Sequence, residues 1–409
     1  MPATNATDTP TAPARSIPLR LTLTLGLLSA MAPLATDLQL PAVPQLAVSL
    51  HTSNASAAAT VSVFFGAFAV GQLVVGGLSD RFGRRRPMLV SLVLFAFSGA
   101  LCAVAPNIGV LLAMRVLQGL AGAGTVVCVR ASVRDYAAGH AAARLYSQLA
   151  TVSMTAPIVA PLLGGALLHF MSWRGLFWVL AGFSVVLVAL AYAMVEESLP
   201  PERRRTGGGH IRVLARVLRH PGFGQHLVLS VCQGAILVSY LSMSAIALHD
   251  DYGVGAQTYS YLFAINGAGL VTAQALNSRL AVRVGPLTML TISIVGYTIG
   301  TSLLVTAFLA HAPLVLVASS LFVTLSTMTI SVPNNMALAM VPFAAEAGSA
   351  VALLGATQQL AGAVIPSVAA VIGTSGRVMA TTMWLAAITG FVQIFVVLRP
   401  RLRAEVHDR

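Results

Sequence analysis

Charged residues are scarce in this chain of 409 residues. Only 9% of the residues are charged, whereas a typical soluble domain contains about 25%. Because ionised side chains keep a soluble surface hydrated, this composition excludes a soluble protein of this size. The hydrophobic share is 57%. Twelve spans of about 20 residues each would take roughly 240 residues, close to that share, so the composition predicts a chain that crosses a membrane many times.

Lysine is absent, and all 24 basic residues are arginine. A formal net charge of +12 is compatible with nucleic-acid binding. The arginines, however, are spread over short connectors instead of forming one basic face with aromatic residues between them. The charge therefore indicates membrane topology, and nucleic acid is not an expected partner.

Cysteine is also rare. Cys102, Cys128 and Cys232 each lie inside an apolar run, and the sequence contains no CxxC pair. This suggests neither a zinc site nor a disulfide framework, and the three residues are expected to pack as small hydrophobic side chains. The nine histidines show no metal-ligand spacing, so we expect no metal and no cofactor.

Twelve apolar runs form two sets of six. The first run follows Arg20 and ends before Pro41, which is more typical of a retained span than of a cleaved signal. The other runs cover about 57–78, 88–105, 109–129, 145–170, 175–195, 223–248, 259–280, 287–310, 313–340, 349–372 and 379–398. The sequence therefore predicts an all-α membrane protein with twelve transmembrane helices in two pseudo-symmetric six-helix bundles.

The polar segments set the expected domain boundaries. We expect a disordered cytoplasmic tail at 1–16, bundles at 17–195 and 223–398, a cytoplasmic linker at 196–222 and a second tail at 399–409. Within the linker, 210–220 has the pattern of a short basic amphipathic helix that lies on the membrane surface.

Arginine distribution predicts the orientation. Arginines occur in alternate connectors, in the linker and in both tails, whereas the remaining connectors carry only Arg174 and Arg377. The connector near Glu346 is the exception, because it lacks arginine. By the positive-inside rule both termini and the linker are cytoplasmic. The composition, rich in arginine and alanine, is typical of a GC-rich bacterial genome, so the expected location is the bacterial cytoplasmic membrane.

Two connectors resemble each other. The one after the second run reads SDRFG from Ser79 to Gly83, and the one after the eighth reads AVRVG from Ala281 to Gly285. They share the Arg-x-Gly core. Two related bundles around a central passage are the architecture of alternating-access transporters.

The sequence from Gly76 to Arg86 reads GGLSDRFGRRR. It resembles the GxLaDRxGRR signature of the major facilitator superfamily, and every fixed position is filled. The resemblance implies a gate in which Asp80 faces the N-terminus of the eleventh helix near Ala347 and Gly348, and Arg81 pairs with Asp135. The implied gating residues are Gly76, Asp80, Arg81, Gly83, Arg84, Arg85, Arg134 and Asp135.

The fourth run contains an arginine, Arg115, within LLAMRVLQG, which matches the lxxxRxxqG motif of the same family. A charge at this depth costs about 2.5–3.5 kcal/mol on insertion scales unless it is paired or hydrated. Asp37 lies at a similar depth and is the expected partner. The pair could be purely structural. A proton-coupling role is favoured because we find no acid or base inside the spans of the second half.

The fifth run resembles an antiporter motif, gxxxGPxxGG, with alanine at two glycine positions. Its marker residues are Pro157, Pro161, Gly164 and Gly165, and the resemblance favours export over uptake. Together with the segments at 36–41 and 129–135, the motif is similar to the bicyclomycin/chloramphenicol-resistance branch of drug:proton antiporters.

Polar and aromatic residues inside the spans are candidates for a substrate pocket, although contact with lipid or a neighbouring helix would explain each of them equally well. The candidates are Phe64, Phe68, Met154, Gln233, Tyr240, Asn266, Asn334 and Gln358. An apolar, aromatic cavity suits bulky lipophilic ligands.

These patterns predict a secondary transporter that exports hydrophobic drug-like molecules in exchange for protons and needs no cofactor beyond the proton gradient. The family resemblance implies that it acts as a monomer. Uptake symport of a neutral metabolite is the alternative transporter. A membrane enzyme or a non-transporting receptor is the alternative class. No GxSxG or HExxH motif occurs, which argues against a hydrolase.

Overall fold

The computed structural model describes residues 18–136, 139–204, 209–220, 222–343 and 347–398. Both predicted tails, 1–16 and 399–409, lie outside these ranges. The described residues form helices and no strand. The twelve long helices are α1 (Leu19–Asp37), α3 (Asn54–Phe82), α4 (Arg85–Ala103), α5 (Ile108–Tyr136), α6 (Gly139–Leu167), α7 (Trp173–Met194), α9 (Phe223–Tyr252), α10 (Ala256–Val284), α11 (Pro286–Leu309), α12 (Leu314–Met340), α13 (Ala347–Ile372) and α14 (Gly376–Val392). Shorter elements are η1 (Leu40–Ala42), α2 (Val43–Ser49), η2 (Pro201–Arg203), α8 (Gly209–Arg219) and η3 (Gln393–Leu398).

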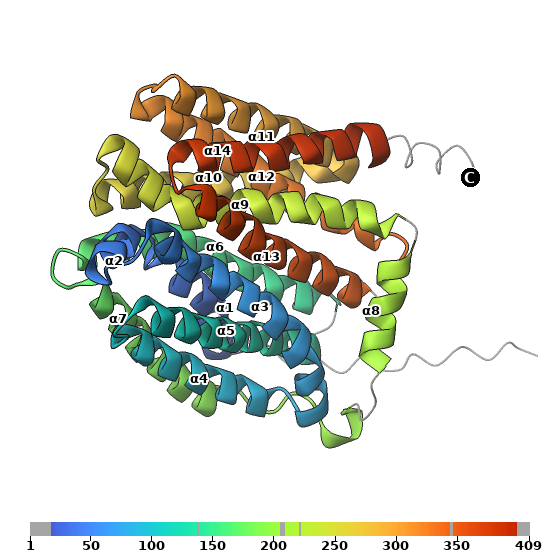
Figure 1. Cartoon of the computed structure of the whole chain (residues 1–409). Coiled ribbons are helices and arrows are strands. Elements are labelled where there is room, and N and C mark those ends of the chain that lie inside the picture. Colours follow the sequence, from blue (N-terminus) through green and yellow to red (C-terminus); the bar gives the residue numbers. More distant parts are fainter. Residues whose placement is uncertain (1–17, 137–138, 205–208, 221, 344–346, 399–409) are drawn as a thin grey trace, which may run out of the picture.

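The long helices form two bundles of six, as the sequence predicts (Figure 1). Helices α1 and α3–α7 make the first half, and α9–α14 make the second. Ten helical segments in the described ranges are long and apolar enough to cross a membrane by length and composition. Helix α10 falls below that threshold because it carries several amides and Arg279, and it packs against α6 of the other half.

Helix ends are set by residues outside the apolar runs. Helix α3 begins three residues before its predicted start, where the Ser53 hydroxyl accepts a hydrogen bond from the Ser56 amide. It ends at Gly83, whose φ of 89° is a conformation that L side chains rarely adopt. Gly285 ends α10 with a φ of 84°. The two Arg-x-Gly connectors therefore make the same type of turn in both halves.

The halves meet along two helix pairs, α3 with α13 and α6 with α10. Small residues permit this contact. A Cβ added at Gly66 would lie 3.0 Å from the Cβ of Ala363, and one at Gly267 would lie 2.9 Å from Ile158. Close approach at glycine is how membrane helices gain packing energy without a hydrophobic driving force.

The arginine-rich loop after α3 and the linker lie at the same end of the molecule, which we call the linker end. Linker helix α8 runs beside the two halves there (Figure 1). Val217 of α8 is fully buried against Phe223 and Phe343 of the second half, whereas the next residue, Leu218, is 52% exposed. The linker helix is therefore anchored to the second half by one face.

Candidate functional site

A cavity of about 760 Å³ lies between the two halves. This volume is within the range of sites for drug-sized ligands. Its wall is mainly apolar and includes Ser29, Ala32, Pro33, Thr36, Asp37, Phe64, Phe65, Phe68, Gln72, Val126, Arg130, Ser153 and Pro157 from the first half, and Leu237, Tyr240, Leu241, Phe263, Asn266, Leu325, Met336, Gln358 and Gln359 from the second.

Helix α1 shows how the sequence builds this wall. Its wall residues recur every three or four positions from Ser29 to Asp37, so one face of the helix borders the cavity. These eight residue steps correspond to about 12 Å of helix. Asp37 is at the end of α1 away from the linker, whereas Arg130 and Met336 on other helices are near the linker end.

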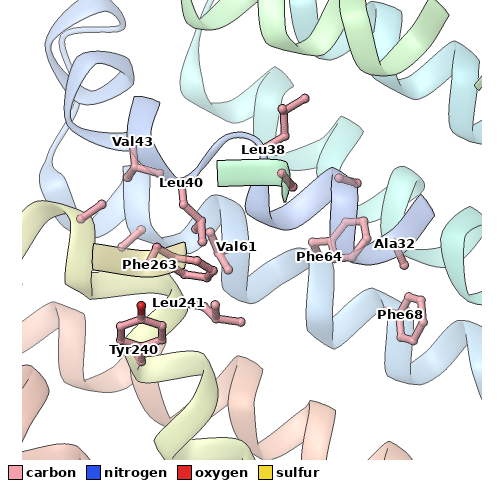
Figure 2. Packing of buried hydrophobic residues seen from close by; sticks show 14 of the residues in the cluster. Ala32, Leu38, Leu40, Val43, Val61, Phe64, Phe68, Tyr240, Leu241 and Phe263 are labelled. Carbon is pink, nitrogen blue, oxygen red and sulfur yellow. The ribbon is translucent and has the colours of Figure 1, made fainter. Parts of the chain in front are cut away.

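Aromatic side chains form the part of the wall near Asp37. The rings of Phe64 and Phe68 stack with their centroids 6.1 Å apart. On the facing side Tyr240 stacks on Phe263 at 5.3 Å, and its hydroxyl accepts a hydrogen bond of 2.9 Å from Asn266. Figure 2 shows Tyr240, Phe263 and Leu241 together, with Phe64 and Phe68 further along α3.

Asp37 is 5% exposed. Its Oδ1 accepts a hydrogen bond of 2.9 Å from the hydroxyl of Thr36. Within the described ranges no cation lies in salt-bridge distance of this carboxyl group. Among the described residues, Asp37 is therefore a buried acid that borders an apolar cavity and has no counter-ion.

Arg115 is fully buried and is not part of the cavity wall. Its Nε donates to the carbonyl of Thr60 at 3.0 Å, and its Nη1 donates to Gln118 Oε1 at 2.6 Å and to the carbonyl of Ala35 at 3.3 Å. The ring centroid of Phe64 lies 4.5 Å from the guanidinium carbon, so a cation–π contact adds to these bonds.

The predicted ion pair between Arg115 and Asp37 is wrong for this conformation. Arg115 bonds to the backbone of α1 two residues before Asp37, but to a carbonyl and not to the carboxylate. The carbonyls, the amide of Gln118 and the aromatic ring together offset the cost of burying the charge. Among the described side chains, its Nη2 is left without a hydrogen-bond partner.

Arg84 is the centre of the arginine-rich loop. It forms ion pairs with Asp80 at 2.6 Å and with Asp135 at 3.1 Å, and it donates a hydrogen bond to Ser79. Burial lowers the pKa of Arg84, but the hydrogen bonds and charges of the two acids outweigh this effect and raise the pKa above its ordinary value. The loop therefore links the ends of α3 and α5.

The expected pairing of Arg81 with Asp135 is wrong, because Arg84 takes that position. Arg81 lies over the ring of Phe82 at 5.3 Å. Arg134 is exposed at the end of α5 and, within the described ranges, makes no ion pair. A Cβ at Gly76 would meet nothing within 4 Å, so close packing does not explain that glycine. The predicted contact of Asp80 with Ala347 and Gly348 falls on side chains outside the described ones.

Glu197 is a residue of this loop that the sequence reasoning missed. Its carboxylate accepts hydrogen bonds from the backbone amides of Arg84 at 2.8 Å and Arg85 at 3.3 Å, and it pairs with Arg204 at 3.8 Å. Arg85 in turn lies over the ring of Tyr192. An acid directly after the sixth span and opposite an arginine-rich loop was the available signal.

The antiporter motif places α6 between α1 and α10. Pro157 borders the cavity, and Pro161 is buried. A Cβ at Gly164 would lie 2.2 Å from the carbonyl oxygen of Leu38, and one at Gly165 would lie 2.3 Å from the hydroxyl of Ser260. The two glycines therefore allow α6 to pack closely against the end of α1 in its own half and against α10 in the other half.

Five of the predicted pocket residues border the cavity: Phe64, Phe68, Tyr240, Asn266 and Gln358. Gln233 and Asn334 do not. Gln233 donates to Ser331, and Asn334 donates to Asn277, so both hold helices of the second half together. The side chain of Met154 lies outside the described ones. Phe263, Gln72 and Arg130 belong to the wall and were not predicted as pocket residues.

The second half contains a base that the sequence reasoning overlooked. His226, in the first turn of α9, is 7% exposed, and its Nδ1 lies 2.9 Å from Asn335 Oδ1. Asn335 also donates to the backbone carbonyl of His226. The expectation that this half has no titratable group inside its spans is therefore wrong, although His226 is away from the cavity wall.

Comparisons with known proteins agree with this geometry. The family model described as Major Facilitator Superfamily matches residues 25–366 and 227–408. The chain belongs to the major facilitator superfamily. It is therefore a transporter of small molecules and not an enzyme. It is 32% identical to the MFS-type transporter YdgK of Bacillus subtilis over 94% of this chain and 96% of that protein. It is 29% identical to a bicyclomycin resistance protein homolog of Haemophilus influenzae over 85% of this chain and 88% of that protein.

Solved structures of the superfamily share the fold. A D-xylose–proton symporter superposes with a TM-score of 0.74 at 18% identity and covers 91% of this chain and 97% of its own. The nucleoside transporter NupG superposes with a TM-score of 0.76 at 15% identity, over 92% and 98% of the two chains. At these identities the similarity concerns the fold, whereas the sequence relatives place the chain beside bicyclomycin and multidrug resistance proteins.

Proposed function

We propose that this transporter exports hydrophobic, drug-like molecules across the bacterial cytoplasmic membrane in exchange for protons. The observation that carries the proposal is Asp37, a buried acid on the wall of a largely apolar cavity between the halves, with no counter-ion among the described residues. A buried ionisable residue in a membrane protein is by default a functional site. The names of the relatives, a bicyclomycin resistance protein homolog and the multidrug resistance protein MdtL, support the same substrate class.

The orientation follows from charge. The arginine-rich loop and the linker would face the cytoplasm, and both termini would lie on that side. The cavity would then extend from Asp37 toward the cytoplasmic end. At the other end, η1 and α2 pack against α9. In the proposed orientation this packing would close the cavity toward the external side.

The transport cycle depends on competition at one residue. From outside, a proton neutralises Asp37 and weakens its hold on the substrate, and the halves rock to expose the cavity to the cytoplasm. There a substrate enters and favours loss of the proton, and the loaded carrier rocks outward. Coupling requires only that the proton and the substrate disfavour each other's binding.

In another conformation of the carrier, Arg115 would form an ion pair with Asp37. Its Nη2 has no hydrogen-bond partner among the described residues, and its Nη1 already contacts the backbone of α1 at Ala35. A small rotation of α1 would bring the carboxylate of Asp37 toward this free donor. Such an ion pair would stabilise one state of the carrier when Asp37 is ionised.

The test is a drug-susceptibility panel in a bacterial host that lacks its own efflux pumps. The chain should raise resistance to several hydrophobic antibiotics and lower their accumulation, and an uncoupler should abolish the difference. Asp37→Asn should lose resistance at equal membrane abundance, whereas Glu202→Gln, which removes an exposed acid of the linker, should retain it. Unchanged resistance in Asp37→Asn would reject the coupling role. Raised accumulation would favour uptake.

A further inference from the structure

The cavity wall carries two charges of opposite sign. Among the wall residues that the structure describes, Asp37 is the acid and Arg130 is the base. Asp37 is eighteen residues from the start of α1, and Arg130 is six residues from the end of α5, and both of these helix termini lie at the linker end. At 1.5 Å per residue the two charges are therefore separated by roughly 18 Å along the bundle. The two ends of the cavity differ in charge.

Arg130 differs from the arginines that set the topology. Arg134 is one turn closer to the helix end and is not part of the wall, whereas Arg130 borders the cavity and is exposed to it. A topology signal requires an arginine at the helix end but does not require one that faces the passage. Arg130 already interacts with another group of the protein. A guanidinium group has five N–H donors, however, and a ligand needs only some of them.

Uncharged hydrogen-bonding groups lie between the two charges. Gln72 on α3 and Gln358 and Gln359 on α13 border the cavity, and a Cβ at Gly355 would lie 3.9 Å from Gln72 Oε1. The phenylalanines lie nearer to Asp37. A ligand therefore meets an aromatic region at one end and amides followed by a guanidinium group at the other.

We infer that Arg130 is a substrate-recognition residue that binds the carboxylate of an amphiphilic organic acid or zwitterion, while the apolar body of the ligand lies against the aromatic wall. This rests on the proposed function, because it specifies the substrate class of the same cavity. Guanidinium groups bind carboxylates in a bidentate, charge-assisted geometry. Water is partly excluded from an apolar cavity, so the attraction is stronger than at an open surface. Purely cationic or neutral lipophilic drugs would gain nothing from this residue.

A matched pair of probes tests the inference by binding alone. 6-(Dansylamino)hexanoic acid and its methyl ester differ only in the carboxylate, and dansyl fluorescence reports their transfer to an apolar site. Titrations of the purified full chain in dodecyl maltoside should show that the acid binds about 10-fold more tightly than the ester, as expected for a charge-assisted hydrogen-bond pair. Arg130→Gln should abolish this preference by weakening the acid and leaving the ester within about 2-fold.

Two further variants serve as controls for the charge and the geometry of Arg130. Arg279→Gln removes an exposed arginine that is not part of the cavity wall and should keep the preference for the acid. Arg130→Lys keeps the charge but loses the bidentate geometry, and should retain only part of that preference. Equal binding of acid and ester by the unmodified chain, or a preference that persists in Arg130→Gln, would overturn the inference, whereas loss of export in the resistance test alone would not.

Discussion

Asn54 and Asp250 join the two halves of the molecule at the end opposite the linker. Asn54 Nδ2 donates a hydrogen bond of 2.9 Å to Asp250 Oδ2, and these residues come from the start of α3 and the end of α9. Close by, Ala245 and Tyr259 border a smaller cavity of about 230 Å³ beneath η1 and α2. The bond therefore links the two halves at the end through which, under the proposed function, exported molecules would leave.

Breaking this bond should open that end more often. Asp250→Ala removes the acceptor, and an exposed hydrogen bond contributes about 0.5–1.5 kcal/mol, so the open population should rise roughly 2- to 10-fold. The measurement is the rate at which a membrane-impermeant maleimide labels Ala245→Cys, whose parent residue is 4% exposed, in a background without the three native cysteines. Asp250→Asn keeps an acceptor oxygen and should label slowly. Equal rates in the two variants would contradict the role of the bond.

Arg84 should contribute more to stability than any neighbouring arginine. Arg84→Gln leaves Asp80 and Asp135 without their shared cation and should lower the free energy of unfolding by about 1–2 kcal/mol, in the lower part of the range for charged hydrogen bonds because both acids are partly solvated. Arg81→Gln removes only a contact with the exposed ring of Phe82 and should change stability by less than about 0.5 kcal/mol. Thermal unfolding in detergent compares the two.

The pH dependence of the Arg84 effect follows from its raised pKa. A cation whose pKa is raised on folding stabilises the protein at every pH below its unfolded value, and the contribution is lost only as the pH rises through the folded value. For arginine this window lies above about 12. The difference between Arg84→Gln and the unmodified chain should therefore be equal at pH 7 and pH 9, and a difference that shrinks over this interval would show that Arg84 is not the cation of the loop.

Hydropathy and spacing predict the depth of a residue but not the direction in which it faces. The sequence placed Asp37 and Arg115 at similar depth, and the twelve long helices in two bundles match its prediction. It did not show that Arg115 turns into the interior of the first half, toward the carbonyls of Thr60 and Ala35, while Asp37 faces the passage. Rotation about a helix axis is fixed by packing with neighbours. The same limitation explains Gln233, which faces Ser331 instead of the cavity.

The separation of Asp37 from Arg115 has a measurable consequence. Residues that share no bond should act independently, so the destabilisation of the double variant Asp37→Asn/Arg115→Gln should equal the sum of the single effects within about 0.5 kcal/mol. The variants are compared by chemical unfolding in detergent without substrate. Arg115→Gln alone should be strongly destabilising, because it leaves the carbonyls of Thr60 and Ala35 unpaired in the interior. A coupling energy above about 1 kcal/mol would mean that the ion pair forms in the resting state.

Gly164 should tolerate no side chain. The carbonyl oxygen of Leu38 lies 2.2 Å from the position that a Cβ would take, and a backbone carbonyl at the end of α1 cannot move away as a flexible side chain could. Gly164→Ala must therefore push α6 away from α1, which also displaces Pro157 and Asp37 on the cavity wall. Overpacking of this kind costs about 1–3 kcal/mol, so the yield of monodisperse protein and its unfolding temperature should both fall.

Gly182 provides the matched control, since it also lies in a long helix of the first half but has open space around it. A Cβ there would meet nothing within 4 Å. Gly182→Ala should be neutral or slightly stabilising, because alanine restricts the unfolded chain and favours a helix. If Gly164→Ala matched Gly182→Ala in stability and resistance, then α6 could not be packed against the end of α1 as closely as this structure places it, and the position of Asp37 relative to the fifth span would have to be set by other contacts.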